Sequence, residues 1–93
     1  MTVGRDARLK ASPHVHARPF DDELVLLDLE GGSYYGLDEI GARFWAGLSE
    51  GRSPREVAES LNGLYRVDPE TLLNDLVALA DQLLEKGLVV VDE

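Results

Sequence analysis

The sequence predicts an α+β domain in which a three-stranded antiparallel sheet precedes three helices. Residues 14–37 contain short apolar runs separated by turn residues, which is typical of hairpins. From residue 38 to residue 86, apolar residues recur at spacings of three and four, and capping residues precede three such segments. With 93 residues the chain is near the size at which a single core becomes adequate. We therefore expect one domain over residues 14–93, preceded by a flexible tail over residues 1–13.

The first strand is predicted over residues 14–18, immediately before Pro19. Residues 1–13 are polar and show no apolar period, which is typical of a loosely attached terminus. His14 and His16 would share one face of the strand, as a pair of metal ligands does. No third ligand accompanies them, so two surface histidines are the better interpretation.

The second and third predicted strands form a hairpin. Residues 23–30 follow a turn at Asp21-Asp22, and Gly31-Gly32 connects them to a returning strand over residues 33–37. Glycines supply the positive φ that two-residue turns need. Tyrosines favour strands because they bury a ring and expose a hydroxyl. A sheet this small leaves its last strand with a free edge.

Two helices follow, each with a clear beginning. Asp38 is a good N-cap for a helix that ends near Glu50, before Gly51. Ser53 caps the next helix, with Pro54 at its first position and Glu56 completing a capping box. The predicted core residues of these helices are Ile40, Phe44, Trp45, Leu48, Val57, Ala58, Leu61 and Leu64 or Tyr65.

The third helix, residues 69–86, carries more apolar surface than a small helix needs. Asp68 caps it, Gly87 ends it, and residues 88–91 are apolar enough to return as a short strand or extended tail. At 100° per residue its apolar side chains span roughly 160°, whereas a stripe a little over 100° wide is usual. The excess indicates either one more packing neighbour inside the domain or a groove wall that receives a partner. These side chains are Leu72, Leu73, Leu76, Val77, Leu79, Ala80, Leu83 and Leu84.

Charge and composition narrow the function classes. The net charge is −9, and from residue 19 onward 5 basic and 17 acidic residues give 5 − 17 = −12. A body this acidic repels phosphate backbones, so nucleic acid is not an expected partner. The chain has no cysteine, no apolar run long enough to span a membrane and no signal peptide, so we expect a cytoplasmic protein.

Signatures of catalysis are missing from the sequence. Gly31-Gly32 joins two strands and does not open a helix, so it is not a phosphate-binding loop. Ser12 and Ser53 are explained by a loop and a cap, and the carboxylates are spread over solvent faces. A catalytic pair of carboxylates needs a pocket that shifts their pKa values. We therefore predict a non-enzyme without cofactor or metal.

The order of residues from the hairpin onward resembles a known family. The stretch that carries the resemblance is GGSYYGLDEIGARFWAGLSEGRSPREVAESL, and the similarity extends from about Phe20 to Val91. It is similar to the PqqD-like family of RiPP recognition elements, which hold the leader peptides of ribosomally made, post-translationally modified peptides. Asp38 stands where the family often has Asn, and the first strand is poorly marked. The matching residues are Tyr35, Leu37, Asp38, Glu39, Gly41, Phe44, Trp45, Gly51, Ser53, Val67, Asp68, Asp75, Leu79, Leu83, Gly87, Leu88 and Val89.

This resemblance implies a winged helix-turn-helix-like fold in which a leader peptide adds as a strand to residues 33–37, against helix 69–86. A free-standing chain of this kind resembles the B1 proteins of lasso peptide pathways, whose partners are a leader peptidase and possibly a cyclase. We expect a monomer or weak dimer. Asp75 would accept a hydrogen bond from the peptide, or else is an ordinary solvated carboxylate. The peptide-binding residues implied are Ser33, Tyr34, Tyr35, Gly36, Leu37, Leu72, Asp75, Leu76, Leu79 and Leu83.

Three other interpretations remain open at this point. The family also includes chaperones for radical-enzyme and cofactor-biosynthesis pathways. A winged-helix DNA-binding regulator would share the fold, but its recognition helix should be rich in Arg, Lys, Asn or Gln, whereas the third helix is acidic. A structural subunit could dimerise through the same apolar helix.

Overall fold

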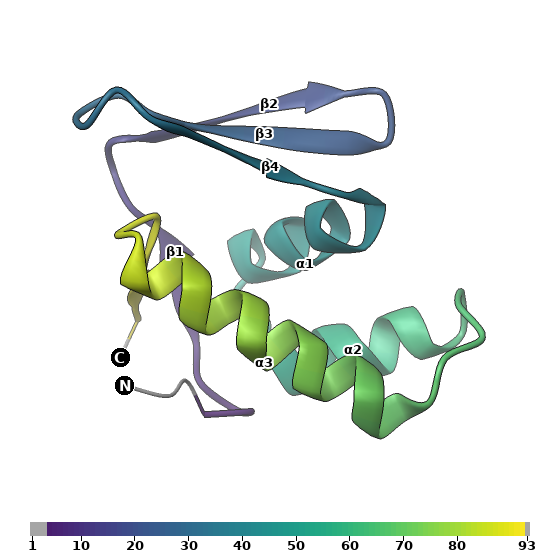
Figure 1. The fold of residues 1–93 in the computed structure, drawn as a ribbon. Helices are drawn as coiled ribbons and strands as arrows, with labels where there is room; N and C mark the ends of the chain where they lie inside the picture. Colours follow the sequence, from purple (N-terminus) through teal and green to yellow (C-terminus); the bar gives the residue numbers. More distant parts are fainter. Residues whose placement is uncertain (1–3, 93) are drawn as a thin grey trace.

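The computed structural model describes residues 4–92, which form two small sheets and three helices (Figure 1). One sheet has three antiparallel strands in the order β2-β3-β4, and the other pairs β1 with β5. The prediction of an α+β fold with a three-stranded antiparallel sheet and three helices is confirmed. The elements are β1 (Leu9–Ala11), β2 (Val15–Phe20), β3 (Glu23–Asp28), β4 (Tyr34–Leu37), α1 (Glu39–Ser49), α2 (Pro54–Asn62), α3 (Pro69–Glu85) and β5 (Val89–Val91).

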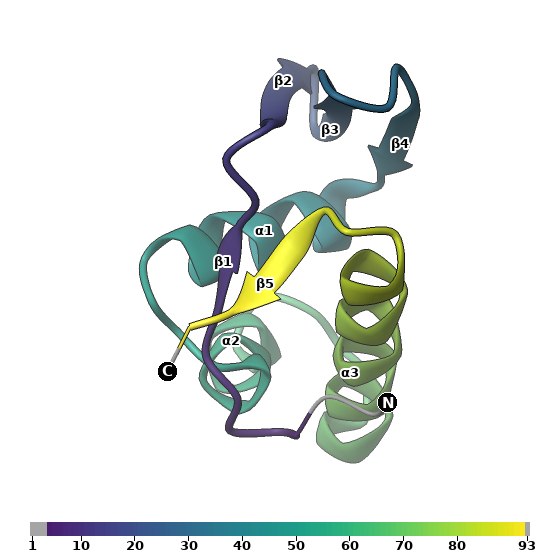
Figure 2. The same ribbon diagram turned by 90° about the vertical axis from the view of Figure 1, so that its left-hand side faces the viewer.

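The three-stranded sheet forms one layer and the helices form the other, with α1 directly beneath the sheet (Figure 2). Leu26 from β3 and Phe44 from α1 are both fully buried where the layers meet. Apolar side chains from every helix join them in one continuous core. Burial of this kind is the main favourable term in folding, at roughly 25 cal/mol per Å² of apolar surface.

The β3–β4 hairpin turns earlier than predicted. The carboxylate of Asp28 accepts hydrogen bonds from the N–H groups of Glu30 and Gly31, at 3.0 and 2.9 Å, so the strand ends at Asp28 and not at Glu30. The Gly31 N–H above all holds the pKa of Asp28 below its usual value. Of the two glycines only Gly32 has a positive φ, at 75°. The connection is therefore a longer loop built on an Asx turn.

The helix boundaries follow the predicted caps. Asp38 accepts a hydrogen bond from the Gly41 N–H, and Asp68 accepts one from the Thr71 N–H. Ser53 and Glu56 form both bonds of the capping box. These bonds satisfy backbone donors that a helix N-terminus otherwise leaves open.

The N-terminal segment differs from the expected tail. Leu9–Ala11 pairs with Val89–Val91, and the Leu9 side chain is only 1% exposed. The Ser12 hydroxyl donates to the Gly87 carbonyl at 2.7 Å, which ties this segment to the end of α3. A three-residue strand with one buried side chain is too short to show a period, so the sequence pattern does not reveal it. Met1–Val3, which also fall in the expected tail, lie outside the described residues.

Most of the wide apolar arc of α3 is packed inside the domain. Buried side chains of α3 face α2, α1 and β5 and leave only the margins of the arc partly exposed. The interpretation of the excess as an internal packing neighbour therefore accounts for the larger part of it. Among the described residues, no helix is long and apolar enough to cross a membrane. The buried residues of α3 are Leu72, Leu73, Leu76, Ala80 and Leu83.

Candidate functional site

The outer edge of β4 has no strand partner among residues 4–92. Its hydrogen-bonding direction follows from the hairpin, where the Asp28 N–H donates to the Ser33 carbonyl at 2.8 Å. Backbone groups in an antiparallel ladder alternate in direction. The backbone groups of Tyr35 and Leu37, two and four residues after Ser33, therefore also point toward β3, opposite Leu26 and Leu24. The N–H and C=O groups of the two intervening residues, Tyr34 and Gly36, face away from the sheet.

The opposite side of β3 gives the same alternation. The Leu29 N–H donates to the His14 carbonyl at 2.9 Å, on the β2 side. Leu29 and Asp28 are consecutive, so their N–H groups must point to opposite neighbouring strands. They do so, toward β2 and β4 respectively. The open edge of β4 therefore offers two donors and two acceptors, spaced as a further strand would need them.

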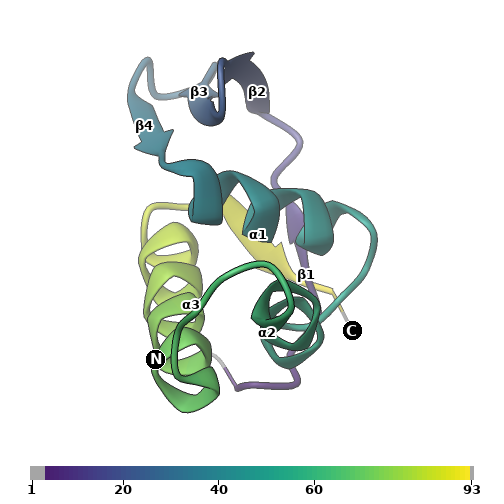
Figure 3. The same ribbon diagram turned by 90° about the vertical axis from the view of Figure 1, so that its right-hand side faces the viewer.

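The C-terminal half of α3 lies beneath this open edge, as two opposite views show (Figures 2 and 3). The Tyr35 hydroxyl donates to Gln82 Oε1 at 2.7 Å, and Lys86 Nζ lies 5.6 Å from the centre of the Tyr35 ring. Gln82 and Lys86, the C-cap residue of α3, fall with Asp75 and Leu79 within an arc of about 60° at 100° per residue. We call Asp75, Leu79, Gln82 and Lys86 the β4-facing stripe.

Two hollows flank the contact between Tyr35 and Gln82. The larger, of ≈ 450 Å³, lies between β4 and α3, and its lining residues are Glu23, Tyr35, Gly36, Leu37, Asp38, Gly41 and Leu79. The smaller, of ≈ 190 Å³, is lined by Ser33, Tyr34, Tyr35, Lys86 and Leu88. The edge of β4 and the β4-facing stripe thus bound two hollows that share Tyr35 as a lining residue, and we call the two hollows together the groove.

The predicted site residues separate into two groups. The first lies at or beside the groove: the β4 segment, in which Ser33, Tyr34 and Gly36 are exposed, Tyr35 is half-buried and Leu37 is buried, and the half-buried Leu79. Asp75 is exposed on the same stripe of α3, two turns before Gln82, and lines neither hollow. The second group, Leu72, Leu76 and Leu83, is buried in the core with at most 3% of each side chain exposed. These three leucines have no open surface to offer a peptide.

Sequence reasoning missed Gln82 and Lys86 as groove residues. The apolar arc, from which the apolar helix residues of the site were predicted, does not include either of them. The spacing from Leu79 to Gln82 and Lys86, three and then four residues, could have placed all three on one face. The groove is therefore formed by the margin of the apolar arc and not by its centre.

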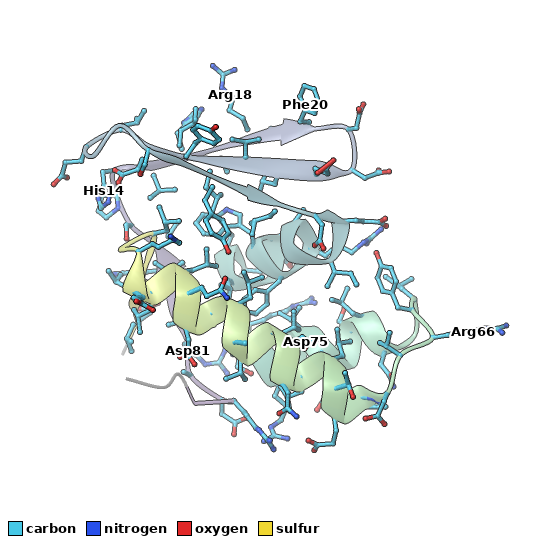
Figure 4. The ribbon with its side chains drawn as sticks, viewed as in Figure 1. His14, Arg18, Phe20, Arg66, Asp75 and Asp81 are labelled. Atoms are coloured by element: carbon cyan, nitrogen blue, oxygen red, sulfur yellow. The ribbon has the colours of Figure 1, made fainter. Side chains whose placement is uncertain are left out.

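The outer face of the sheet carries different side chains. Arg18 and Phe20 of β2 point away from the helices, whereas Asp75 and Asp81 belong to α3 in the other layer (Figure 4). His14 lies 3.8 Å from Asp28 and 3.6 Å from Glu30, and His16 is exposed. Among the described residues, no three His, Cys, Asp or Glu side chains come together as metal ligands do.

Comparison with known proteins identifies the family. A sequence model described as coenzyme PQQ synthesis protein D (PqqD) matches residues 23–89. The chain belongs to the PqqD family. The PqqD match includes β3, β4 and all three helices, and hence both walls of the groove, while β1 and β2 lie outside it. Comparison with curated protein sequences gives no match.

Two solved structures resemble this PqqD-family chain along nearly its whole length. One is TbiB1 in complex with the TbiA(beta) leader peptide, with 40% identity, a TM-score of 0.80, and coverage of 86% of this chain and 93% of that chain. The other is lasso peptide synthetase B1 complexed with its leader peptide, with 31% identity, a TM-score of 0.83, and coverage of 90% and 99%.

A third structure, the heterocyclase TruD, shares the fold alone. Its identity is 19% and its TM-score 0.63, and the match covers 92% of this chain but 12% of TruD. The same fold therefore occurs both as a small separate chain and within a much larger enzyme chain.

Proposed function

We propose that this protein binds the leader of a ribosomally made precursor peptide as an added strand on the open edge of β4, against α3. The observation that carries the proposal is the open edge itself, where Tyr34 and Gly36 direct two donors and two acceptors away from the sheet. Both similar structures with high coverage are complexes with leader peptides, which supports the same role here.

Strand addition explains how a small groove can hold a flexible peptide. Leader residues opposite Tyr34 and Gly36 exchange backbone hydrogen bonds with them, and the alternate side chains turn toward α3. Four such bonds contribute about 2–6 kcal/mol net. Association and ordering cost roughly 4–15 kcal/mol, so buried apolar anchors of about 1.5–3 kcal/mol each must supply the remainder. The hollow beside Leu79 is the place for the first anchor.

In this role the protein is a template, and the chemistry belongs to its partners. We propose that it presents the leader, in the cytoplasm, to the leader peptidase and the cyclase of a lasso peptide pathway. A groove that recognises mainly backbone suits this task, because the leader is held while the rest of the precursor stays accessible.

Fluorescence polarisation with a labelled TbiA(beta) leader peptide tests the proposal, alongside the leader of any precursor encoded next to this gene. We expect saturable binding in the micromolar range or tighter. A series of leaders, each N-methylated at one backbone position, then tests strand addition. Methylation should abolish binding at alternate positions only, because a strand directs every second N–H to one neighbour.

The proposal is contradicted if neither leader binds at protein concentrations of about 100 μM. That result would mean a binding free energy weaker than roughly −5.5 kcal/mol. Leader binding that tolerates N-methylation at every position would contradict the strand-addition mechanism. Sedimentation of the protein with and without leader separates peptide capture from dimerisation, because a dimer formed through α3 would change mass when peptide displaces the second copy.

A further inference from the structure

Gln82 occupies the middle of the groove, between the two hollows. Its Oε1 accepts the Tyr35 hydroxyl hydrogen at 2.7 Å, and Lys86 stands one turn further along α3, over the same ring. The remaining hydrogen-bonding group of the Gln82 side chain is the Nε2 amide, with two N–H donors. No acceptor for these donors occurs among residues 4–92. Water satisfies them in the free protein, because Gln82 is exposed.

A strand added to β4 would remove that water. The added residue opposite Tyr35 directs its side chain toward α3, as Tyr35 does, and therefore covers the Gln82 amide. A donor that loses water without gaining an acceptor weakens binding. An oxygen on the added strand removes this penalty, whereas a purely apolar contact does not.

We infer that Gln82 is a specificity-determining residue, which donates a hydrogen bond through Nε2 to an oxygen of the bound strand at the position opposite Tyr35. The inference rests on the proposed function. Tyr35 is then a positioning residue, because its hydroxyl fixes Oε1 and thereby fixes the direction of Nε2. A glutamine side chain has several rotatable bonds, so fixing it before binding lowers the entropy lost on binding.

Three variants separate these roles when their affinities for the labelled TbiA(beta) leader are measured. Gln82→Leu removes the amide but keeps the size of the side chain, and should weaken binding by about twofold to tenfold. Gln82→Glu keeps the acceptor for Tyr35 but has no donor, and its charge repels an oxygen on the peptide. It should therefore weaken binding at least as much as Gln82→Leu does.

Tyr35→Phe tests positioning through a double-mutant cycle. Removal of the hydroxyl should weaken binding in the parent but have no effect in the Gln82→Leu background, where no amide remains to be positioned. Tyr65→Phe is the matched control. It also removes one phenol hydroxyl, which here donates to Glu39 at 2.7 Å, outside the groove. It should leave the affinity unchanged, and thermal unfolding should show that every variant is folded.

The results discriminate sharply. If the parent binds the leader, and if both Gln82→Leu and Gln82→Glu bind it as tightly as the parent does, the inference is wrong while the proposed function stands. If Tyr35→Phe weakens binding equally in both backgrounds, Tyr35 acts by itself and the positioning role is wrong. If the parent binds no leader, the proposed function fails, and the inference fails with it.

Discussion

The two edges of the three-stranded sheet differ in what they offer a further strand. The His14 carbonyl accepts a hydrogen bond from β3, and backbone direction alternates along a strand. At the outer edge of β2, the residues whose backbone groups point outward are therefore Val15, Ala17 and Pro19. The Val15 N–H already donates to the Ser12 carbonyl at 3.1 Å, and Pro19 has no N–H. Only Ala17 has an outward donor that no hydrogen bond within residues 4–92 satisfies.

The β4 edge has neither of the two features that block β2, a proline and an outward N–H that is already hydrogen-bonded. Neither Tyr34 nor Gly36 is a proline, and no hydrogen bond within the described residues satisfies their outward N–H groups. Proteins commonly blunt edge strands with proline, since an open edge pairs with other chains. One edge of this sheet is blunted in that way and the other is not. An edge that is not blunted is what the proposed strand addition to β4 requires.

The β4 edge also differs in its surroundings. Leu79 and Gln82 of α3 lie beneath it and add side-chain contacts to the backbone ladder. Backbone groups alone would pair with almost any extended chain. In proteins that bind peptides by strand addition, the open edge supplies affinity and the side-chain pockets beside it supply selectivity.

The largest expected effect comes from blocking the open edge. Gly36→Pro removes an outward donor from β4 and puts a ring at the edge, so leader affinity should fall at least about tenfold. Ala17→Pro makes the same change on β2 and should leave the affinity unchanged. Fluorescence polarisation with the leader peptide gives both values, and circular dichroism checks the fold.

Equal losses from these two prolines would show that β4 has no special role and would refute the comparison of edges. Tyr35→Pro is a poorer test, because the Tyr35 N–H faces β3 and its removal damages the sheet itself.

The next effect contrasts two half-buried leucines on opposite sides of α3. Leu79 lines the hollow beside β4, whereas Leu84 lines a separate hollow with Val91. Leu79→Asp puts a charge where the proposed peptide would exclude water, so it should weaken binding by about tenfold to a hundredfold. Leu84→Asp adds the same charge away from the groove, so the affinity should change less than about twofold.

Both variants should lose similar amounts of thermal stability, because both leucines are half-buried and packed against the core. If Leu84→Asp weakens binding and Leu79→Asp does not, the peptide lies on the β5 side of α3. Leu76→Asp would give no information on binding, since Leu76 is 1% exposed and a buried charge there unfolds the domain.

The sequence predicts the helices of this fold well because their ends depend on local chemistry. The Ser53–Glu56 capping box involves residues three positions apart, so the pattern alone reveals it. The hairpin was predicted from Gly31-Gly32, yet the loop depends on the Asp28 carboxylate, which the glycine pattern does not show. Pairing of Leu9–Ala11 with Val89–Val91 joins the two ends of the chain and has no local signal.

The groove could be predicted only in part, because its residues are selected by contacts between segments that are far apart in the sequence. Periodicity shows that α3 has a wide apolar arc, but which part of that arc is buried depends on where α2 and β5 pack. Leu72, Leu76 and Leu83 proved to be core residues. Gln82 belongs to the groove because Tyr35 lies opposite it, a contact across 47 residues of sequence.

The smallest expected effect concerns Asp75, at the far end of the β4-facing stripe. Asp75→Asn removes one exposed charge from the groove side of α3, and Glu85→Gln removes one from the side that faces Val91. If Asp75 contacts the leader, its variant should bind up to about fivefold more weakly at low salt, the range for exposed charged contacts. The difference should vanish near 1 M salt, where the Debye length falls to about 3 Å.

Glu85→Gln should change the affinity less than about twofold at either salt concentration. Titration of both variants with the labelled leader at the two salt concentrations provides the comparison. If Asp75→Asn behaves like Glu85→Gln throughout, Asp75 is an ordinary solvated carboxylate. The contact surface of α3 then ends at Leu79, because Asp75 is the next residue of the stripe toward the helix N-terminus. A bound leader would in that case be held by about two turns of the helix, from Leu79 to Lys86, and by the short edge of β4.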